Sequence, residues 1–142
     1  MLLAFELSGE HATLPASEVF ASLESVCSDF EIILILDGCL IIEIRKDAGK
    51  TAGILAKKLS MTHHITEVLG IGGGGEEDVL DCVEKADLEI DGTYSIRVKR
   101  VREYSTIDTE SMEKRIGSIF FERSASRPEK PRSAITTTAY RG

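Results

Sequence analysis

Apolar and polar residues alternate along the first 70 positions in a pattern that predicts four strands and two helices. Short runs that alternate or are rich in β-branched residues indicate strands, whereas apolar residues recurring every three or four positions indicate amphipathic helices. The predicted strands are residues 2–7, 31–36, 39–44 and a fourth from 65 to 69 or 71. The predicted helices follow the first and third strands, at residues 13–27 and 51–60.

Local signals define two of the connections. Thr13 is the expected N-cap of the first helix, with Pro15 in its first turn and Glu18 close behind. The dipeptide Asp37-Gly38 separates the second and third strands, and we expect it to supply the positive φ angles of a two-residue hairpin.

The order strand, helix, strand, strand, helix, strand predicts a ferredoxin-like βαββαβ module over residues 1–71. Two helices on one face of a four-stranded antiparallel sheet would bury both apolar stripes. The expected fold class is therefore α+β, and a module of this size is small but can fold alone.

The second half begins with glycines and continues as helix, strand and helix. We predict a glycine joint at residues 72–75 and a compact core at residues 76–122. In that core a helix begins at Glu76, a strand over residues 94–102 alternates apolar and basic side chains, and Asp108 caps a second helix. The buried stripe of this second helix is expected to be Met112, Ile116, Ile119 and Phe120.

The glycine run contains a formal G-x-G-x-x-G match at Gly70, Gly72 and Gly75. A pyrophosphate would bind there through the free N–H groups and positive dipole of the following helix. Residues 76–78 are all acidic, and each would repel a phosphate by about a kcal/mol or more at short range. We therefore expect a flexible joint before an acid-capped helix, and no dinucleotide site.

The last residues, 123–142, are polar, basic and contain prolines. We predict a basic linker at residues 123–132, followed by a weak edge strand or a tail at residues 133–140.

Charge is distributed unevenly along the chain of 142 residues, which is 42% hydrophobic and 29% charged, as expected of a globular protein. The net charge of −7 would argue against a nucleic-acid partner if it were spread evenly. Residues 1–75 carry −5, residues 76–93 carry −7 and residues 94–142 carry +5. This asymmetry favours a polyanionic partner for the basic part.

Six basic side chains on the predicted strand and the following helix are candidates for contact with RNA phosphates. They are Arg97, Lys99, Arg100, Arg102, Lys114 and Arg115. Tyr94 and Tyr104 flank the strand, where a ring could stack on an unpaired base, although core packing is favoured for Tyr94. The alternative is that the basic strand only neutralises the acidic helix.

Neither catalysis nor metal binding is indicated by a recognisable set of residues. His63 and His64 are adjacent with no Cys/His set to complete a tetrahedral site, and we expect them at a helix end or turn. The three cysteines form no C-x-x-C pair, which fits reduced thiols in a cytoplasmic protein. No secretory signal and no membrane span are expected, because a basic leader and a long apolar run are both lacking.

Three stretches resemble known RNA-modifying enzymes. I-R-V-K-R-V at residues 96–101, followed by I-D-T-E-S-M-E-K-R-I-G at residues 107–117, resembles the THUMP domain. F-E-L-S-G-E at residues 5–10, with L-P-x-x-E ending at Glu18, resembles the start of archaeal tRNA guanine-N2 methyltransferases, and residues 56–63 are similar to a helix-end segment in them. The resemblance covers about residues 1 to 120.

The resemblance implies that residues 76–122 are the core of a THUMP α/β domain. Two further sheet strands of the family pattern are not recognisable, so we expect this domain to be incomplete. In the family, THUMP and the ferredoxin-like module together recognise the acceptor end of tRNA, and Arg97, Lys99 and Arg115 match positions that are commonly basic there.

The resembled methyltransferases hold the target amine beside S-adenosylmethionine with an Asp/Asn-Pro-Pro-Tyr/Phe motif, which has no match here. We therefore expect a tRNA-targeting segment that holds no cofactor, binds no metal and is inactive alone. S-adenosylmethionine would bind in a separate catalytic methyltransferase domain, supplied in cis or in trans. Two alternatives are the THUMP segment of a tRNA thiouridine synthase, which the L-P-x-x-E start disfavours, and a protein-interaction module that binds no RNA.

Overall fold

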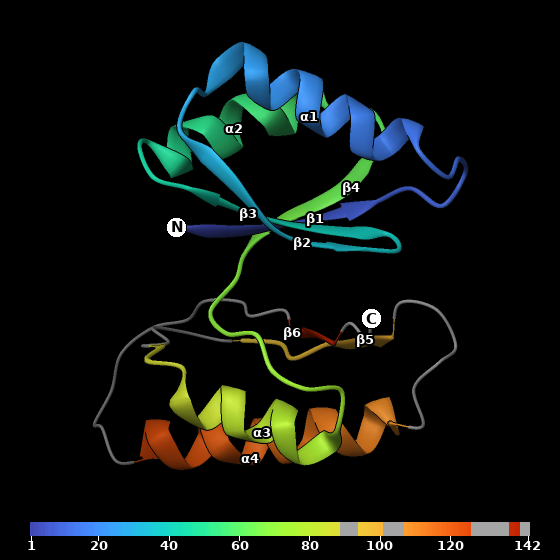
Figure 1. Ribbon diagram of the computed structural model, residues 1–142. Coiled ribbons are helices and arrows are strands. Elements are labelled where there is room, and N and C mark those ends of the chain that lie inside the picture. The colour runs from blue at the N-terminus through green and yellow to red at the C-terminus, as the bar shows by residue number, and fades with distance from the viewer. Residues whose placement is uncertain (89–93, 101–106, 126–136, 140–142) are drawn as a thin grey trace. The chain divides into compact units, whose positions relative to one another are not determined.

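The computed structural model describes residues 1–88, 94–100, 107–125 and 137–139. The chain divides into two compact units, Met1–Val68 and Leu69–Gly142 (Figure 1). Each unit has its own hydrophobic core. The α+β class predicted from the sequence is confirmed.

The first unit is an antiparallel sheet with two helices on one face (Figure 1). In sheet order its strands are β2 (Phe30–Leu36), β3 (Cys39–Ile44), β1 (Leu2–Leu7) and β4 (Thr62–Glu67). The helices are α1 (Leu14–Val26) and α2 (Ala48–Lys58). Phe5, Leu23 and Leu55 are fully buried between these layers, so the ferredoxin-like βαββαβ prediction is confirmed.

The β2–β3 hairpin depends on a single glycine. Leu36 pairs with Cys39 across the two-residue loop, and Gly38 has a φ of 82°. Asp37 does not have a positive φ, so the expectation that both loop residues would supply one was wrong. One positive φ at the second loop position is enough, as in a type II turn.

Helix α2 begins three residues before its predicted start. Asp47 adopts the left-handed conformation, with φ 51° and ψ 36°, and turns the chain from β3 directly into a helix that starts at Ala48. Left-handed backbone is tolerated by aspartate better than by most residues, but apolar periodicity does not reveal which residue adopts it.

Strand β4 also begins earlier than predicted. Its pairing with β1 places Thr62 opposite Leu7 and His64 opposite Glu6. His63 and His64 are therefore exposed residues of a strand, and the prediction of a helix end or turn was wrong. Five of the six residues of this edge strand are polar and only Ile65 packs against the core, so apolar periodicity does not reveal where the strand begins.

The first turn of α1 is stabilised by a histidine. Thr13 occupies the N-cap position as predicted, but its side chain makes no capping hydrogen bond. Instead His11 Nδ1 accepts hydrogen bonds from the backbone N–H groups of Thr13 and Leu14, each at 3.2 Å. This replaces the oxygen acceptor that a capping side chain normally supplies.

Glu18 fastens α1 to the connection between α2 and β4. Its two carboxylate oxygens accept hydrogen bonds from the backbone N–H groups of Ser60 and Met61, both at 2.9 Å. The carbonyl of Met61 in turn accepts the N–H of Ser8, just beyond β1, at 2.8 Å. Glu18 thus has a structural role that joins three segments of the module.

The second unit contains helices α3 (Glu76–Lys85) and α4 (Thr109–Ala125), which lie side by side (Figure 1). Strands β5 (Val98–Arg100) and β6 (Thr137–Ala139) form a parallel pair. The core residues are Leu80, Val83, Ile96, Val98, Ile107, Met112, Ile116 and Phe120, with Ile119 partly buried. The predicted stripe of α4 is thereby confirmed.

The end of the chain differs from the prediction at Arg123, and it contains one of the two structures expected for residues 133–140. Arg123 was expected in a linker but lies in the last turns of α4, where it donates hydrogen bonds to the carbonyls of Glu84 and Ala86 and lies over the Phe120 ring. Of the two alternatives for residues 133–140, an edge strand is found at the three described positions.

The hydrogen bonds of Glu18 can be tested by substitution. Glu18→Ala leaves two backbone N–H groups without their acceptor and should lower the free energy of unfolding by about 1–3 kcal/mol, measured by urea denaturation. Glu24→Ala is the matched control, since Glu24 is exposed on the same helix and its side chain has no partner in the described chain. Equal losses in the two variants would contradict the role of Glu18.

Candidate nucleic-acid interface

Three of the predicted RNA-binding residues follow one another along the edge of the second unit. Arg97 precedes β5, Lys99 and Arg100 lie on it, and all three are exposed. The alternation predicted here is confirmed at Ile96 and Val98, which are buried. The strand predicted from residue 94 was too long, because residues 94–97 are not part of it and β5 begins at Val98. Arg102 lies outside the described residues.

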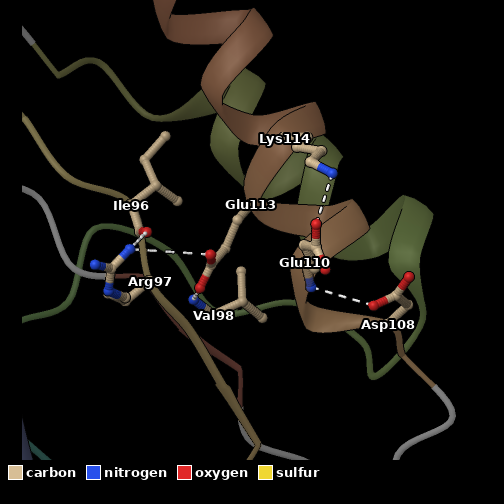
Figure 2. Close-up of polar contacts among 7 residues, drawn as sticks. All are labelled: Ile96, Arg97, Val98, Asp108, Glu110, Glu113 and Lys114. Atoms are coloured by element: carbon tan, nitrogen blue, oxygen red, sulfur yellow. Dashed lines mark hydrogen bonds and ion pairs between the residues drawn. The ribbon is translucent and has the colours of Figure 1, made fainter.

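Glu113 of α4 holds the start of β5 in place (Figure 2). Its Oε1 accepts the backbone N–H of Val98 at 2.9 Å, and its Oε2 lies 4.0 Å from Nη1 of Arg97. The same Nη1 donates to the carbonyl of Ile96 at 3.2 Å. The Arg97 side chain remains 71% exposed, so it is oriented by these contacts and still faces solvent.

The first turn of α4 is capped as predicted. Asp108 Oδ1 accepts the backbone N–H of Glu110 at 3.2 Å (Figure 2). The Asp108 carbonyl accepts the N–H of Met112 at 3.0 Å. Glu110 also pairs with Lys114 at 2.7 Å, one helical turn on. Both side chains are about three-quarters exposed, and such pairs are weak, so Lys114 can be drawn to another anion.

Arg115 contacts the acidic start of α3. Its guanidinium lies 3.2 Å from Glu76 and 2.9 Å from Glu77. The acidic helix is therefore neutralised at this end by a residue of α4. Contact between Arg115 and a phosphate would require loss of one or both of these ion pairs.

The predicted basic residues do not form one continuous group. Successive residues of an α-helix are rotated by 100°, so Glu113, which contacts Arg97, and Arg115, which contacts α3, lie on opposite flanks of α4. Lys114 lies between them, on the side away from the buried Met112. Arg97 and Lys99 therefore lie on one side of the β5 segment and Arg100 is exposed at its end, whereas Lys114 and Arg115 lie on other faces of α4.

Tyr94 belongs to the core of this unit. Its ring centroid lies 5.9 Å from that of Phe120 at an interplanar angle of 58°, a favourable tilted arrangement. Tyr104, the other candidate for stacking on a base, lies outside the described residues.

The glycine run packs against α3. A Cβ on Gly72 would come within 2.5 Å of Cys82 Sγ, and a Cβ on Gly73 would collide with the Asp78 carboxylate. Asp78 Oδ2 also accepts the N–H of Gly75 at 3.2 Å. The start of α3 therefore already has an anion, its own carboxylate, beside its free N–H groups.

Among the described residues, no group of three or more His, Cys, Asp or Glu side chains could hold a metal ion. None of the helices in that part of the chain is long and apolar enough to cross a membrane.

Comparison with known proteins first defines the fold. No family model matches the sequence. PH1313 from Pyrococcus horikoshii Ot3 superposes with a TM-score of 0.61 over 99% of this chain and 50% of that one, at 8% identity. TrmN from Thermus thermophilus gives 0.60 over 100% and 43%, at 16% identity. A chain titled a predicted N6-adenine-specific DNA methylase, from Listeria monocytogenes, gives 0.59 over 99% and 37%, at 10% identity. The fold is therefore one that also occurs as part of longer chains.

A curated relative shows similarity in sequence as well. The chain is 30% identical over 118 residues to the tRNA (guanine(10)-N2)-dimethyltransferase of Methanothermobacter thermautotrophicus strain Delta H. The matched region is 82% of this chain and 33% of that protein. The chain thus matches about one third of the length of this relative.

The Glu113 contact predicts different effects of two substitutions. Glu113→Ala removes the acceptor of the Val98 N–H and should lower the free energy of unfolding by about 1–3 kcal/mol. Glu113→Gln keeps an oxygen acceptor and should cost less than half as much. Hydrogen exchange of the Val98 amide should be fastest in the alanine variant, and unchanged exchange in that variant would show that the contact does not form.

Proposed function

We propose that this chain is the RNA-binding, targeting part of a tRNA (guanine-N2) methyltransferase and binds the acceptor end of tRNA. The observation that supports this best is the similarity to the Methanothermobacter enzyme, which extends over most of this chain but one third of the enzyme. A targeting module joined to a separate catalytic region would give this pattern of coverage.

Charge in the second unit favours the same function. The acidic start of α3 is paired internally with Arg115. Arg97, Lys99 and Arg100 are exposed along the β5 segment. Phosphate contacts from such side chains supply affinity and position without reading sequence, as a targeting domain requires. In this proposal residues 76–122 are a THUMP-like core, and Arg102 and Lys114 extend its contacts with tRNA. Arg115 joins them only on loss of its ion pairs with Glu76 and Glu77.

Catalysis is assigned to another region. S-adenosylmethionine would bind in a methyltransferase domain supplied in cis or in trans, and this chain alone would hold no cofactor and be inactive. We expect the protein to act in the cytoplasm, where tRNA is modified. The Methanothermobacter relative is a dimethyltransferase, which favours a methyltransferase over a thiouridine synthase as the enzyme that this chain would serve.

Substitution of Arg97 and Lys99 tests the proposal. Arg97→Gln/Lys99→Gln should weaken binding to an unmodified tRNA transcript, measured by fluorescence anisotropy between 50 and 200 mM salt. Because two phosphate contacts are lost, the slope of log K against log salt concentration should fall in magnitude by about 1.4–1.8.

The matched control is Lys85→Glu, which changes the net charge by the same amount. Lys85 is exposed and pairs with Asp81 at 2.6 Å, an interaction that raises the pKa of Lys85 and keeps it protonated. This variant should keep the salt slope of the wild type. Absence of tRNA binding by the wild-type protein at low salt would refute the proposal, and the protein-interaction module would then be the better hypothesis.

A further inference from the structure

All five basic residues of the first unit lie within fourteen consecutive positions, residues 45–58. This segment contains a single acidic residue, Asp47, and has a net charge of +4. The rest of the unit, Met1–Val68, contains nine acidic residues and no lysine or arginine. The unit is therefore strongly polarised, and its positive part is α2 together with the turn that precedes it.

Two of the five cations have partners within the fold. Arg45 lies 3.6 Å from Asp29, 2.5 Å from Glu31 and 3.4 Å from Glu43. Lys58 Nζ lies 3.4 Å from Ser25 Oγ.

The other three, Lys46, Lys50 and Lys57, are exposed. Within the described residues their side chains make no hydrogen bond or ion pair.

Lys50 and Lys57 face outward from α2. Lys50 and Lys57 are seven residues apart, so they share one face of the helix and lie roughly 10 Å apart along its axis. Thr51 and Leu55 are buried on the opposite face. Lys46 lies just before the helix N-terminus, which continues the row of positive charge.

Stability of the fold does not explain two of these lysines. The N-terminus of a helix carries partial positive charge, which favours anions there and disfavours cations. The first turn of α2 contains Lys50 and no acidic residue, and Lys46 precedes it. Asp47 is exposed and makes no capping hydrogen bond. Lys57 lies in the last turn, where a cation does favour the helix.

Two glycines lie on the exposed side of the same helix. A Cβ added to Gly49 or Gly53 would meet no atom of the described residues within 4 Å, so no contact with that part of the chain requires glycine there. Each costs about 0.5–1 kcal/mol of helix stability relative to alanine. Gly53 lies between Lys50 and Lys57 on this face, beside the half-buried Ile54, and its lack of a side chain lets the backbone of a ligand approach the helix closely there.

We infer that the outward face of α2, defined by Lys46, Lys50 and Lys57, is a second surface that contacts the phosphate backbone of RNA. The charge complementarity of three unpaired lysines, together with the free N–H groups at the start of α2, favours a polyanion over a protein partner. This inference rests on the proposed function and names the face of the first unit that contacts tRNA.

The triple variant Lys46→Gln/Lys50→Gln/Lys57→Gln tests this surface with the same tRNA transcript and salt series. The loss of three phosphate contacts should weaken binding and reduce the magnitude of the salt slope by about 2–3. The control Ala12→Glu/Ala21→Glu/Ser28→Glu changes the net charge equally at exposed positions in and around α1, and it should keep the slope. Circular dichroism should show unchanged folding in both.

The outcomes separate this inference from the proposed function. One outcome is that the lysine variant keeps the salt slope of the wild type while Arg97→Gln/Lys99→Gln reduces it. The α2 surface is then refuted and the proposed function stands. If the control variant weakens tRNA binding and reduces the salt slope as much as the lysine variant does, a general charge effect explains the result and the α2 surface is again refuted. If the wild-type protein does not bind tRNA, both fail.

The glycines give a further test of close approach. Gly49→Ala/Gly53→Ala should raise the thermal stability of the protein and weaken tRNA binding several-fold. Higher stability with unchanged binding would show that the ligand does not approach the helix backbone there.

Discussion

One carboxylate, that of Glu113, determines the geometry on which the candidate interface depends. It accepts the backbone N–H of Val98 and approaches Arg97 from the same side. The first contact is a hydrogen bond of a charged acceptor, whereas the second is a long ion pair exposed to water and contributes little. Glu113 therefore holds the strand firmly and Arg97 only weakly, so a phosphate can recruit the guanidinium without disturbing the backbone that presents it.

The cations of this protein differ in function because they differ in their neighbours. Arg45 faces three carboxylates and Arg115 faces two, so both mainly offset charge within their own units. Lys50 and Lys57 face solvent without a partner in the described chain. Net charge conceals this difference. Residues 1–75 together have a net charge of −5, whereas positions 45–58 within them, which include the lysines of α2, have a net charge of +4.

Two of the stretches in the first unit that carry the resemblance lie in contact with each other. The L-P-x-x-E pattern ends at Glu18, and the separate segment at residues 56–63 contains Ser60 and Met61. In the folded unit the carboxylate of Glu18 accepts both of their N–H groups. Two stretches that are more than forty residues apart in the sequence, and that both carry the resemblance, therefore meet in one contact of the folded unit.

The sequence alone determined the features that depend on local periodicity and local hydrogen bonds. The α+β class, the βαββαβ order, the buried stripe of α4 and the Asp108 cap all follow from which positions are apolar and which side chains can bond to their own backbone. The tertiary structure alone decided the start of β4, the hydrogen bonds of Glu18 to Ser60 and Met61, and the partner of Arg115. Periodicity identifies the buried face of an element, but it cannot tell which side chain of a neighbouring element lies beside that face.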